Sequence, residues 1–187
     1  MISHIEQERF KEFRKKKKED SYLKYKNKIY IIIYGAYNPP RTNSHLGEKE
    51  RLEKLRDRLK DEGYSKTYLV DDFEGNDALN KSFDALEYAD LNIFIFTCRG
   101  KTDSVTRELT EAIKKIIIWK CLVYEEVYKK SYTEITAMGR LLKDELKKNR
   151  YLPVQVPIED DDELYFTVSG EVFQFLGSRY VSRLGIC

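Results

Sequence analysis

The chain has 187 residues, with 34 Lys and Arg against 32 Asp and Glu, so its formal net charge is only +2. This length corresponds to one domain, and a hydrophobic content of 41% with 13% aromatic residues excludes a wholly disordered chain. No apolar run reaches the roughly 18 residues that span a bilayer, and the charged N-terminus has no signal-peptide core. We therefore expect a cytoplasmic protein with no membrane contact, whose three cysteines stay reduced. Abundant Lys, Glu, Ile and Tyr with little Gln, His and Met is typical of proteins from thermophiles.

The net charge hides an uneven distribution. Residues 1–28 hold ten basic and five acidic residues, so this segment carries +5 and residues 29–187 carry −3. We therefore divide the chain into a basic N-terminal arm, 1–28, and an α/β domain, 29–187. The arm combines Phe10 and Phe13 with the lysine run 15–18, a composition that could contact the phosphates of nucleic acid. The alternative is a solvated helix that packs its apolar side chains on the body or on a second subunit of a homo-oligomer.

From residue 29 onward, buried-strand patterns alternate with helical ones. Residues 29–34 are a continuous β-branched and aromatic run that ends at Gly35, which is typical of a strand buried on both faces. Further strands are predicted at 67–70, at 91–96, in the later part of 116–124 and at 154–158. Apolar residues at helical spacing predict five helices. Three are given by their ranges: 47–62, 132–148 with Ile135, Leu142 and Leu146 inward, and a last helix around 170–184. The other two are marked by their apolar residues, one by Leu79, Phe83 and Leu86 and one by Val105, Leu109, Ala112 and Ile113. Pro157 predicts an edge strand, and the acidic run 159–163 is expected to be a solvated turn before the last helix.

Strand and helix thus alternate five times, which predicts parallel strands joined by right-handed crossovers in a three-layer α/β sandwich. With the flavodoxin-like strand order 2-1-3-4-5, ligands bind beyond the carboxyl ends of the strands, between the first and the third. The segments expected there are 35–41 and 97–104, and Asp71 and Asp72 end the neighbouring second strand. Glycine, tyrosine, cations and several carboxylates therefore converge on one predicted crevice.

Two blocks of the sequence resemble nucleoside 2-deoxyribosyltransferases. Residues 28–37 (KIYIIIYGAY) are similar to the family's opening strand and Gly-containing turn. Residues 86–96 followed by 103–109 are similar to its block of helix, Ala-Asp, strand and Asp-x-x-x-x-Glu. The TIR domains that cleave NAD share this layout, with a glutamate in a Ser-x-x-x-Glu-Leu setting. The resemblance covers about residues 28–124. The sequence differs from the deoxyribosyltransferases at Val105, where a small glycine is usual. It differs from TIR domains because no tryptophan lies near the glutamate.

The resemblance implies a nucleotide-binding N-glycosidase or glycosyl transferase that acts on NAD or a nucleoside derivative. Breaking an N-glycosidic bond develops positive charge on the sugar ring, and a carboxylate beneath the ring stabilises that cation or attacks it. We expect Glu108 to be this carboxylate and Asp103 to be a second catalytic carboxyl. The candidates for substrate binding are Gly35, Tyr37, Arg99, Ser104 and Asp72. The alternative function is a non-enzymatic TIR-like interaction or signalling module, associated with nucleic acid through its basic arm.

The leaving group separates the possible substrates. Nicotinamide leaves a pyridinium as a neutral base and needs no general acid, whereas an unactivated purine is helped by protonation. His45 is the only histidine of residues 29–187, so the acid for a purine would be Asp71, Asp72, Asp103 or a tyrosine. This scarcity favours NAD or a related nucleotide.

Each candidate also has a purely structural interpretation. Glu108 could be an exposed helix residue, Asp103 or Ser104 could be the N-cap of the third helix, and Asp71 and Asp72 could be strand-end turn residues. Arg99 and Lys101 could bind phosphate or only occupy a loop. No Gly-x-Gly-x-x-Gly or Walker sequence occurs, so we expect neither a conventional dinucleotide site nor a P-loop, and no cofactor or metal.

Overall fold

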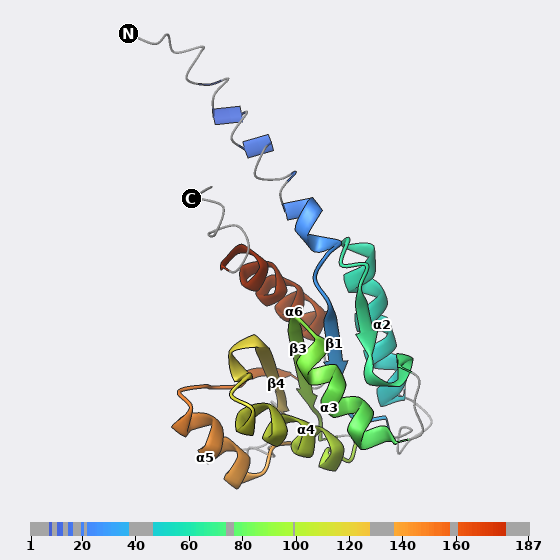
Figure 1. The fold of residues 1–187 in the computed structure, drawn as a ribbon, viewed down its shortest axis with the longest axis vertical. Coiled ribbons are helices and arrows are strands. Elements are labelled where there is room, and N and C mark those ends of the chain that lie inside the picture. The colour runs from blue at the N-terminus through green and yellow to red at the C-terminus, as the bar shows by residue number, and fades with distance from the viewer. Residues whose placement is uncertain are drawn as a thin grey trace.

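A single parallel sheet of five strands forms the centre of the protein (Figure 1). The computed structural model describes residues 8, 11–12, 15–16, 20, 22–37, 47–73, 77–98, 100–127, 137–157 and 161–178. The strands are β1 (Ile31–Tyr34), β2 (Thr67–Leu69), β3 (Leu91–Phe96), β4 (Cys121–Val127) and β5 (Val154–Pro157). Their order, β2-β1-β3-β4-β5, confirms the predicted flavodoxin-like topology and places β5 at an edge, as Pro157 predicted.

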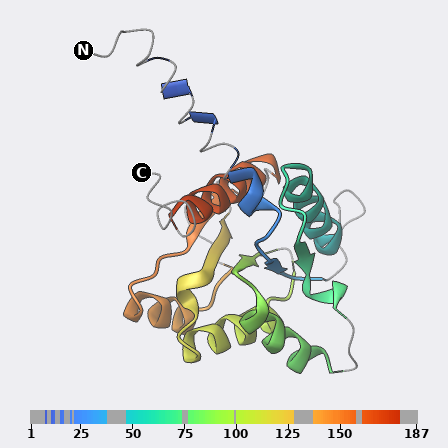
Figure 2. The same ribbon diagram turned by 45° about the horizontal axis from the view of Figure 1, so that its top comes forward.

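Helices cover both faces of the sheet, which makes the fold a three-layer α/β sandwich (Figure 2). The helices are α2 (Glu48–Asp61), α3 (Ala78–Tyr88), α4 (Asp103–Lys114), α5 (Arg140–Lys148) and α6 (Asp161–Leu176). Apolar side chains of α2 and α6 pack on one face, and those of α3, α4 and α5 pack on the other. Among the described helices, none is long and apolar enough to cross a membrane.

The central strands are buried because every residue of their apolar runs faces one of the two helical layers. All four residues of β1 and all six of β3 are buried. Ile33 pairs in register with Leu69 of β2 on one side and with Ile93 of β3 on the other. A continuous β-branched run is stable in this position because neither face meets water. Both strands end at the same edge of the sheet, and β3 continues to Phe96, two residues past the partner of Tyr34.

Two helix starts differ from the sequence prediction. The helix expected over 132–148 begins at Arg140. It starts there because Gly139 takes an extended N-cap conformation and residues 137–138 form a bend. Residues 132–136, with Ile135, lie outside the described residues. The last helix, expected around 170–184, begins at Asp161. The acidic residues 161–163 are its first turn rather than a solvated turn before it, since carboxylates are favourable at a helix N-terminus. The predicted end of this helix, beyond residue 178, lies outside the described residues.

The end of the basic arm contacts the domain. Residues 22–26 are helical, and the ring of Tyr22 stacks on Phe173 of α6 with 4.8 Å between centroids. The Lys26 ammonium donates to the carbonyl of Glu62 at 3.0 Å and lies 4.7 Å from the centroid of the Tyr64 ring. Phe10, Phe13 and most of the preceding residues lie outside the described residues, so the nucleic-acid and subunit hypotheses for the arm stay predictions.

One helix end carries a residue in a conformation that glycine favours. Ile116, directly after α4, has φ 56°. Its N–H donates to Ile113, and the next N–H donates to Ala112, each at 3.0 Å, which closes the helix. A left-handed conformation costs an L-residue roughly 1–2 kcal/mol, and the Ile116 side chain, 77% exposed, recovers little by burial.

We expect Ile116→Gly to stabilise the protein. The free energy of unfolding should rise by about 0.5–1 kcal/mol, because relief of the left-handed conformation outweighs the larger chain entropy of unfolded glycine. Denaturant titration measures this difference. Arg107→Gly, at an exposed position inside α4, is the control and should lower the same free energy by about 1 kcal/mol. An Ile116→Gly protein no more stable than the wild type would contradict this account.

Candidate functional site

Polar side chains from four elements meet at the carboxyl edge of the sheet, where the strand order reverses between β1 and β3. Glu108 lies on α4, Ser82 on α3 and Asp71 in the short turn after β2, while Tyr34 ends β1 and Tyr37 follows it. Charge interactions link Glu108 to Asp71 and to both tyrosines. This is the location at which open parallel sheets bind ligands.

Glu108 is a buried carboxyl group, not the exposed helix residue of the structural alternative. It is 8% exposed. Burial raises its pKa to about 7; a hydrogen bond with the Ser82 side chain opposes the rise, and the charge of Asp71 adds to it. Close to neutral pH the carboxyl group is therefore present in both its protonated and its ionised form. An acid tuned to this range is typical of catalytic sites.

The Tyr37 hydroxyl is near enough to this carboxyl group for their charges to interact. It is shielded from solvent and faces the backbone of Val70 and Asp71, and among the described residues it has no hydrogen bond of normal geometry. Burial, reinforced by the charges of Asp71 and Glu108, raises the pKa of Tyr37, so the hydroxyl stays protonated. The Lys49 ammonium of α2 is 3.1 Å from the Asp71 carboxylate and 5.8 Å from the centroid of the Tyr37 ring. Charge interactions thus connect Glu108, the predicted catalytic carboxylate, with Tyr37, a predicted substrate-binding residue, and with Asp71.

The other predicted carboxylates lie further out. Asp103 and Ser104 are exposed in the first turn of α4, whose N-cap is Thr102 rather than either of them. The Asp72 carboxylate accepts from the N–H of Leu69 at 2.8 Å and from Arg56 at 3.2 Å. Asp72 therefore closes the turn after β2, which agrees with the interpretation of Asp72 as a turn residue at the end of the strand.

The glycines of the predicted crevice allow close approach of the backbone. A Cβ on Gly35 would lie 2.6 Å from the end of the Leu52 side chain, so a larger residue there would displace Leu52 where β1 ends against α2. A Cβ on Gly100 would lie 2.7 Å from the Cβ of Ala36, which shows that the segments after β1 and β3 run side by side. Lys101 is exposed, and Arg99 lies outside the described residues.

Sequence reasoning missed a buried charge cluster on the α2 and α6 face of the same edge. Arg51 of α2 is 6% exposed. Its guanidinium donates to Glu48 at 2.7 Å, to Asp161 at 2.8 Å and to both carboxylate oxygens of Glu126, which is 0% exposed. Burial opposes the charge of Arg51, but the carboxylates outweigh it and hold its pKa above the ordinary value. The sequence feature that could have indicated this cluster is the pair of acids 125–126, which directly follows the apolar run of β4.

The neighbouring carboxylate, Glu125, points to the opposite face of the sheet. It is 1% exposed, and its Oε1 accepts from the N–H of Met138 at 3.0 Å and from Lys143 at 2.9 Å. Its Oε2 is buried and has no hydrogen-bond partner among the residues that the structure describes. The Cys98 thiol, after β3, lies close enough that Glu125 and Glu126 add to the rise in its pKa caused by burial. Such an unpaired buried acceptor is rare in folded proteins and calls for an explanation.

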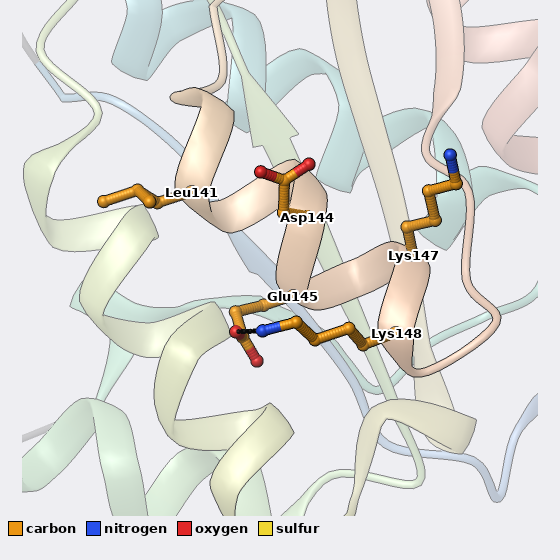
Figure 3. A pocket seen from close by; sticks show the side chains of 5 residues that line it. All are labelled: Leu141, Asp144, Glu145, Lys147 and Lys148. Atoms are coloured by element: carbon orange, nitrogen blue, oxygen red, sulfur yellow. Dashed lines mark hydrogen bonds and ion pairs between the residues drawn. The ribbon is translucent and has the colours of Figure 1, made fainter.

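A separate pocket lies along α5 (Figure 3). It is lined by Leu141, Asp144, Glu145, Lys147 and Lys148, which all come from that one helix. None of the predicted site residues lines it. Within the described ranges, no group of three or more His, Cys, Asp or Glu side chains is arranged to hold a metal ion.

No protein-family model matches this sequence, and no curated protein matches it as a relative. The fold and the site define a class only: an α/β protein with a five-stranded parallel sheet of order 2-1-3-4-5, with buried carboxyl groups at the carboxyl edge of that sheet.

The raised pKa of Glu108 predicts a pH-dependent stability. The folded state keeps the Glu108 proton up to about pH 7, whereas the unfolded chain releases it near pH 4.5. This contribution to stability is therefore complete below pH 4.5 and is lost as the pH rises to 7, by on the order of 3 kcal/mol. Glu108→Gln cannot ionise, so its stability relative to the wild type should increase over this window. Urea titrations at pH 4.5 and 7.5 measure the change.

The control for this measurement is Glu111→Gln, on the same helix and partly exposed beside Lys115. We expect it to keep the wild-type pH dependence. A Glu108→Gln protein with the same pH dependence as the wild type would show that Glu108 is solvated.

The Arg51 cluster predicts a large loss of stability on removal of the guanidinium. Arg51→Met leaves Glu126 buried without its partner and should cost about 3–5 kcal/mol of unfolding free energy. The matched control is Arg58→Met on the same helix, because the pair of Arg58 with Asp162 is exposed and contributes about 1 kcal/mol or less. Equal losses in the two variants, measured by urea titration, would refute a special role for Arg51.

Proposed function

We propose that this protein cleaves or transfers an N-glycosidic bond of NAD or a nucleoside derivative, like the TIR-like and nucleoside 2-deoxyribosyltransferase-like proteins that residues 28–124 resemble. One observation carries the proposal: the carboxyl group of Glu108 is buried at the strand-order reversal, where its charge interacts with Tyr37 and Asp71. Two independent lines support this residue, since the sequence resemblance and the geometry of the sheet lead to the same glutamate.

The chemistry follows from the environment of Glu108. As the C1′–N bond breaks, its electron pair leaves with the base and the sugar ring becomes cationic. An ionised carboxylate with little surrounding water stabilises this cation more than a solvated one would, or adds to C1′ as a nucleophile. Water or an acceptor base then takes the sugar. The protonated Tyr37 hydroxyl can orient the carboxylate or the ligand by donating a hydrogen bond.

The arrangement favours a leaving group that needs no proton. Tyr37 holds its proton firmly because its pKa is raised. Asp103 is five residues before Glu108 on α4, a rotation of about 140° around the helix axis, so the two carboxyl groups do not share a face. A pyridinium such as that of NAD leaves as neutral nicotinamide and requires no general acid, whereas a purine is helped by one.

The test is incubation of the protein with NAD and with nucleosides, followed by product analysis at several pH values. We expect release of free base, with kcat/KM rising as the pH passes through about 7, because the ionised form of Glu108 is the active one. Glu108→Gln should lower the rate by at least about a hundredfold. Glu111→Gln, on the same helix, should leave it unchanged.

Two outcomes would count against the proposal. One is the absence of any product at high enzyme concentration. The other is an activity that Glu108→Gln retains, which would assign the chemistry to a different residue or to a contaminant.

A further inference from the structure

The amino edge of the sheet, where the strands begin, exposes large apolar side chains in two neighbouring loops. The first loop, residues 114–120, leads from the end of α4 into β4, and the second, residues 147–153, leads from the end of α5 into β5. Ile116 in the first loop and Leu152 in the second are each 77% exposed, and Trp119 is 54% exposed. Because β4 and β5 are parallel neighbours, both loops lie at the same edge.

The two loops are fixed to the domain and to each other. The Tyr151 hydroxyl of the second loop donates to the carbonyl of Cys121, directly after the first loop, at 2.9 Å. The buried Lys120 ammonium donates to the carbonyls of Glu87 and Ala89, at the end of α3, at 2.8 and 2.6 Å. The exposed side chains therefore belong to one surface built on three helix ends.

Both loops also contain an exposed residue in a conformation that glycine favours. Two residues past the ends of α2, α4 and α5 stand Gly63, Ile116 and Arg150, with φ 100°, 56° and 58°. In each case the N–H of this residue donates to the carbonyl three residues earlier, at 2.9–3.0 Å. The end of α2 has the expected glycine, whereas Ile116 and Arg150 adopt the left-handed conformation at a cost and stay exposed. Strain that packing does not repay points to a role for the two side chains.

The charges within the two loops are all positive. The basic residues are Lys114, Lys115, Lys120, Lys147, Lys148 and Arg150, and neither loop contains an acid. Lys147 and Arg150 are exposed, and neither forms an ion pair within the part of the chain that the structure describes. Exposed cations thus stand next to the exposed apolar side chains.

The acids near these cations lie behind them or are already paired. They are Asp84, Glu87, Asp90, Glu111, Asp144 and Glu145. Those at 84, 111, 144 and 145 precede the helix ends by about one turn, roughly 5 Å back from the edge. Glu87 pairs with Lys115, and the Asp90 carboxylate accepts from the N–H of Tyr30 at 2.9 Å. The outermost layer of this edge is therefore apolar and cationic.

We propose that this amino edge docks on the surface of a lipid bilayer that contains anionic lipids. Ile116, Trp119 and Leu152 enter the boundary between headgroups and acyl chains, and Lys147 and Arg150 contact the anionic headgroups. Lys and Arg suit this boundary because their apolar stems stay among the acyl chains while their charges reach the headgroups. Aliphatic side chains such as those of Ile116 and Leu152 do not stack on bases, so a nucleic acid fits this surface less well.

Docking of this kind needs no spanning helix. The proposal therefore departs from the sequence-based expectation of no membrane contact, which followed from the lack of a spanning segment. It is independent of the proposed function, because the carboxyl edge that holds Glu108 is at the other end of the strands.

The test uses Trp119, the single tryptophan of the chain, as the probe. The full chain is mixed with vesicles of phosphatidylcholine and phosphatidylserine, or of phosphatidylcholine alone, and binding is measured by sedimentation and by tryptophan emission. We expect the emission to shift to shorter wavelength on the anionic vesicles. Binding should be at least about tenfold weaker without phosphatidylserine or at high salt, which screens the charges.

Two variants test the side chains that carry the proposal. Ile116→Gly should weaken vesicle binding about tenfold, although it is expected to stabilise the fold, so unfolding cannot account for the loss. Arg150→Gln should weaken it about fivefold. The matched controls are Leu141→Ser and Arg140→Gln, at exposed positions in the first turn of α5 and so at the opposite edge. Both should bind vesicles as the wild type does.

Three outcomes would overturn the proposal. One is no binding to anionic vesicles. Another is sedimentation with vesicles while the Trp119 emission stays unchanged, which would assign the binding to the basic arm, residues 1–28. The third is a single-stranded oligonucleotide that quenches Trp119 and displaces the vesicles at lower concentration, which would assign this edge to nucleic acid.

Discussion

The buried guanidinium of Arg51 is the interaction on which the carboxyl edge of the sheet depends. It joins α2 to the end of β4 through Glu126 and to the first turn of α6 through Asp161. A charge taken out of water is tolerated only when paired and hydrogen-bonded, so these partners hold one another in place. The cluster thereby fixes how three elements meet, and Glu48 of the same cluster lies against the segment that follows β3.

The two acids that end β4 show how alternation along a strand builds an edge of this kind. Glu126 faces α2 and α6, where Arg51 uses both of its oxygens. Glu125 faces α5, where one oxygen accepts two hydrogen bonds and the other has no partner within the described part of the chain. Together with Glu108 over the end of β3, they place buried carboxyl groups on both sides of the sheet at one end.

Most of the fold was predictable because it follows from local patterns. The continuous apolar runs 29–34 and 91–96 predicted strands buried on both faces, and their alternation with helical stripes predicted a parallel sheet. The errors lie where local signals conflict. The start of α6 was missed because an acidic first turn resembles a polar loop, although Leu164, Val168, Val172 and Leu176 continue at helical spacing from it.

The sequence alone predicted the parallel sheet with its flavodoxin-like strand order, from residue periodicity and the right-handed connection of parallel strands. The choice of Glu108 came from the resemblance of residues 86–109 to known families, and ligand binding at the carboxyl edge stays a prediction. Only the tertiary structure decided that Glu108 is buried, which raises its pKa, and that Ser82 of α3 and Asp71 of the turn after β2 act on its carboxyl group. The same holds for Arg51, whose partners Glu126 and Asp161 are 75 and 110 residues away in the chain. Burial and ion pairing of this kind are properties of distant segments brought together, and no local pattern in the chain encodes them.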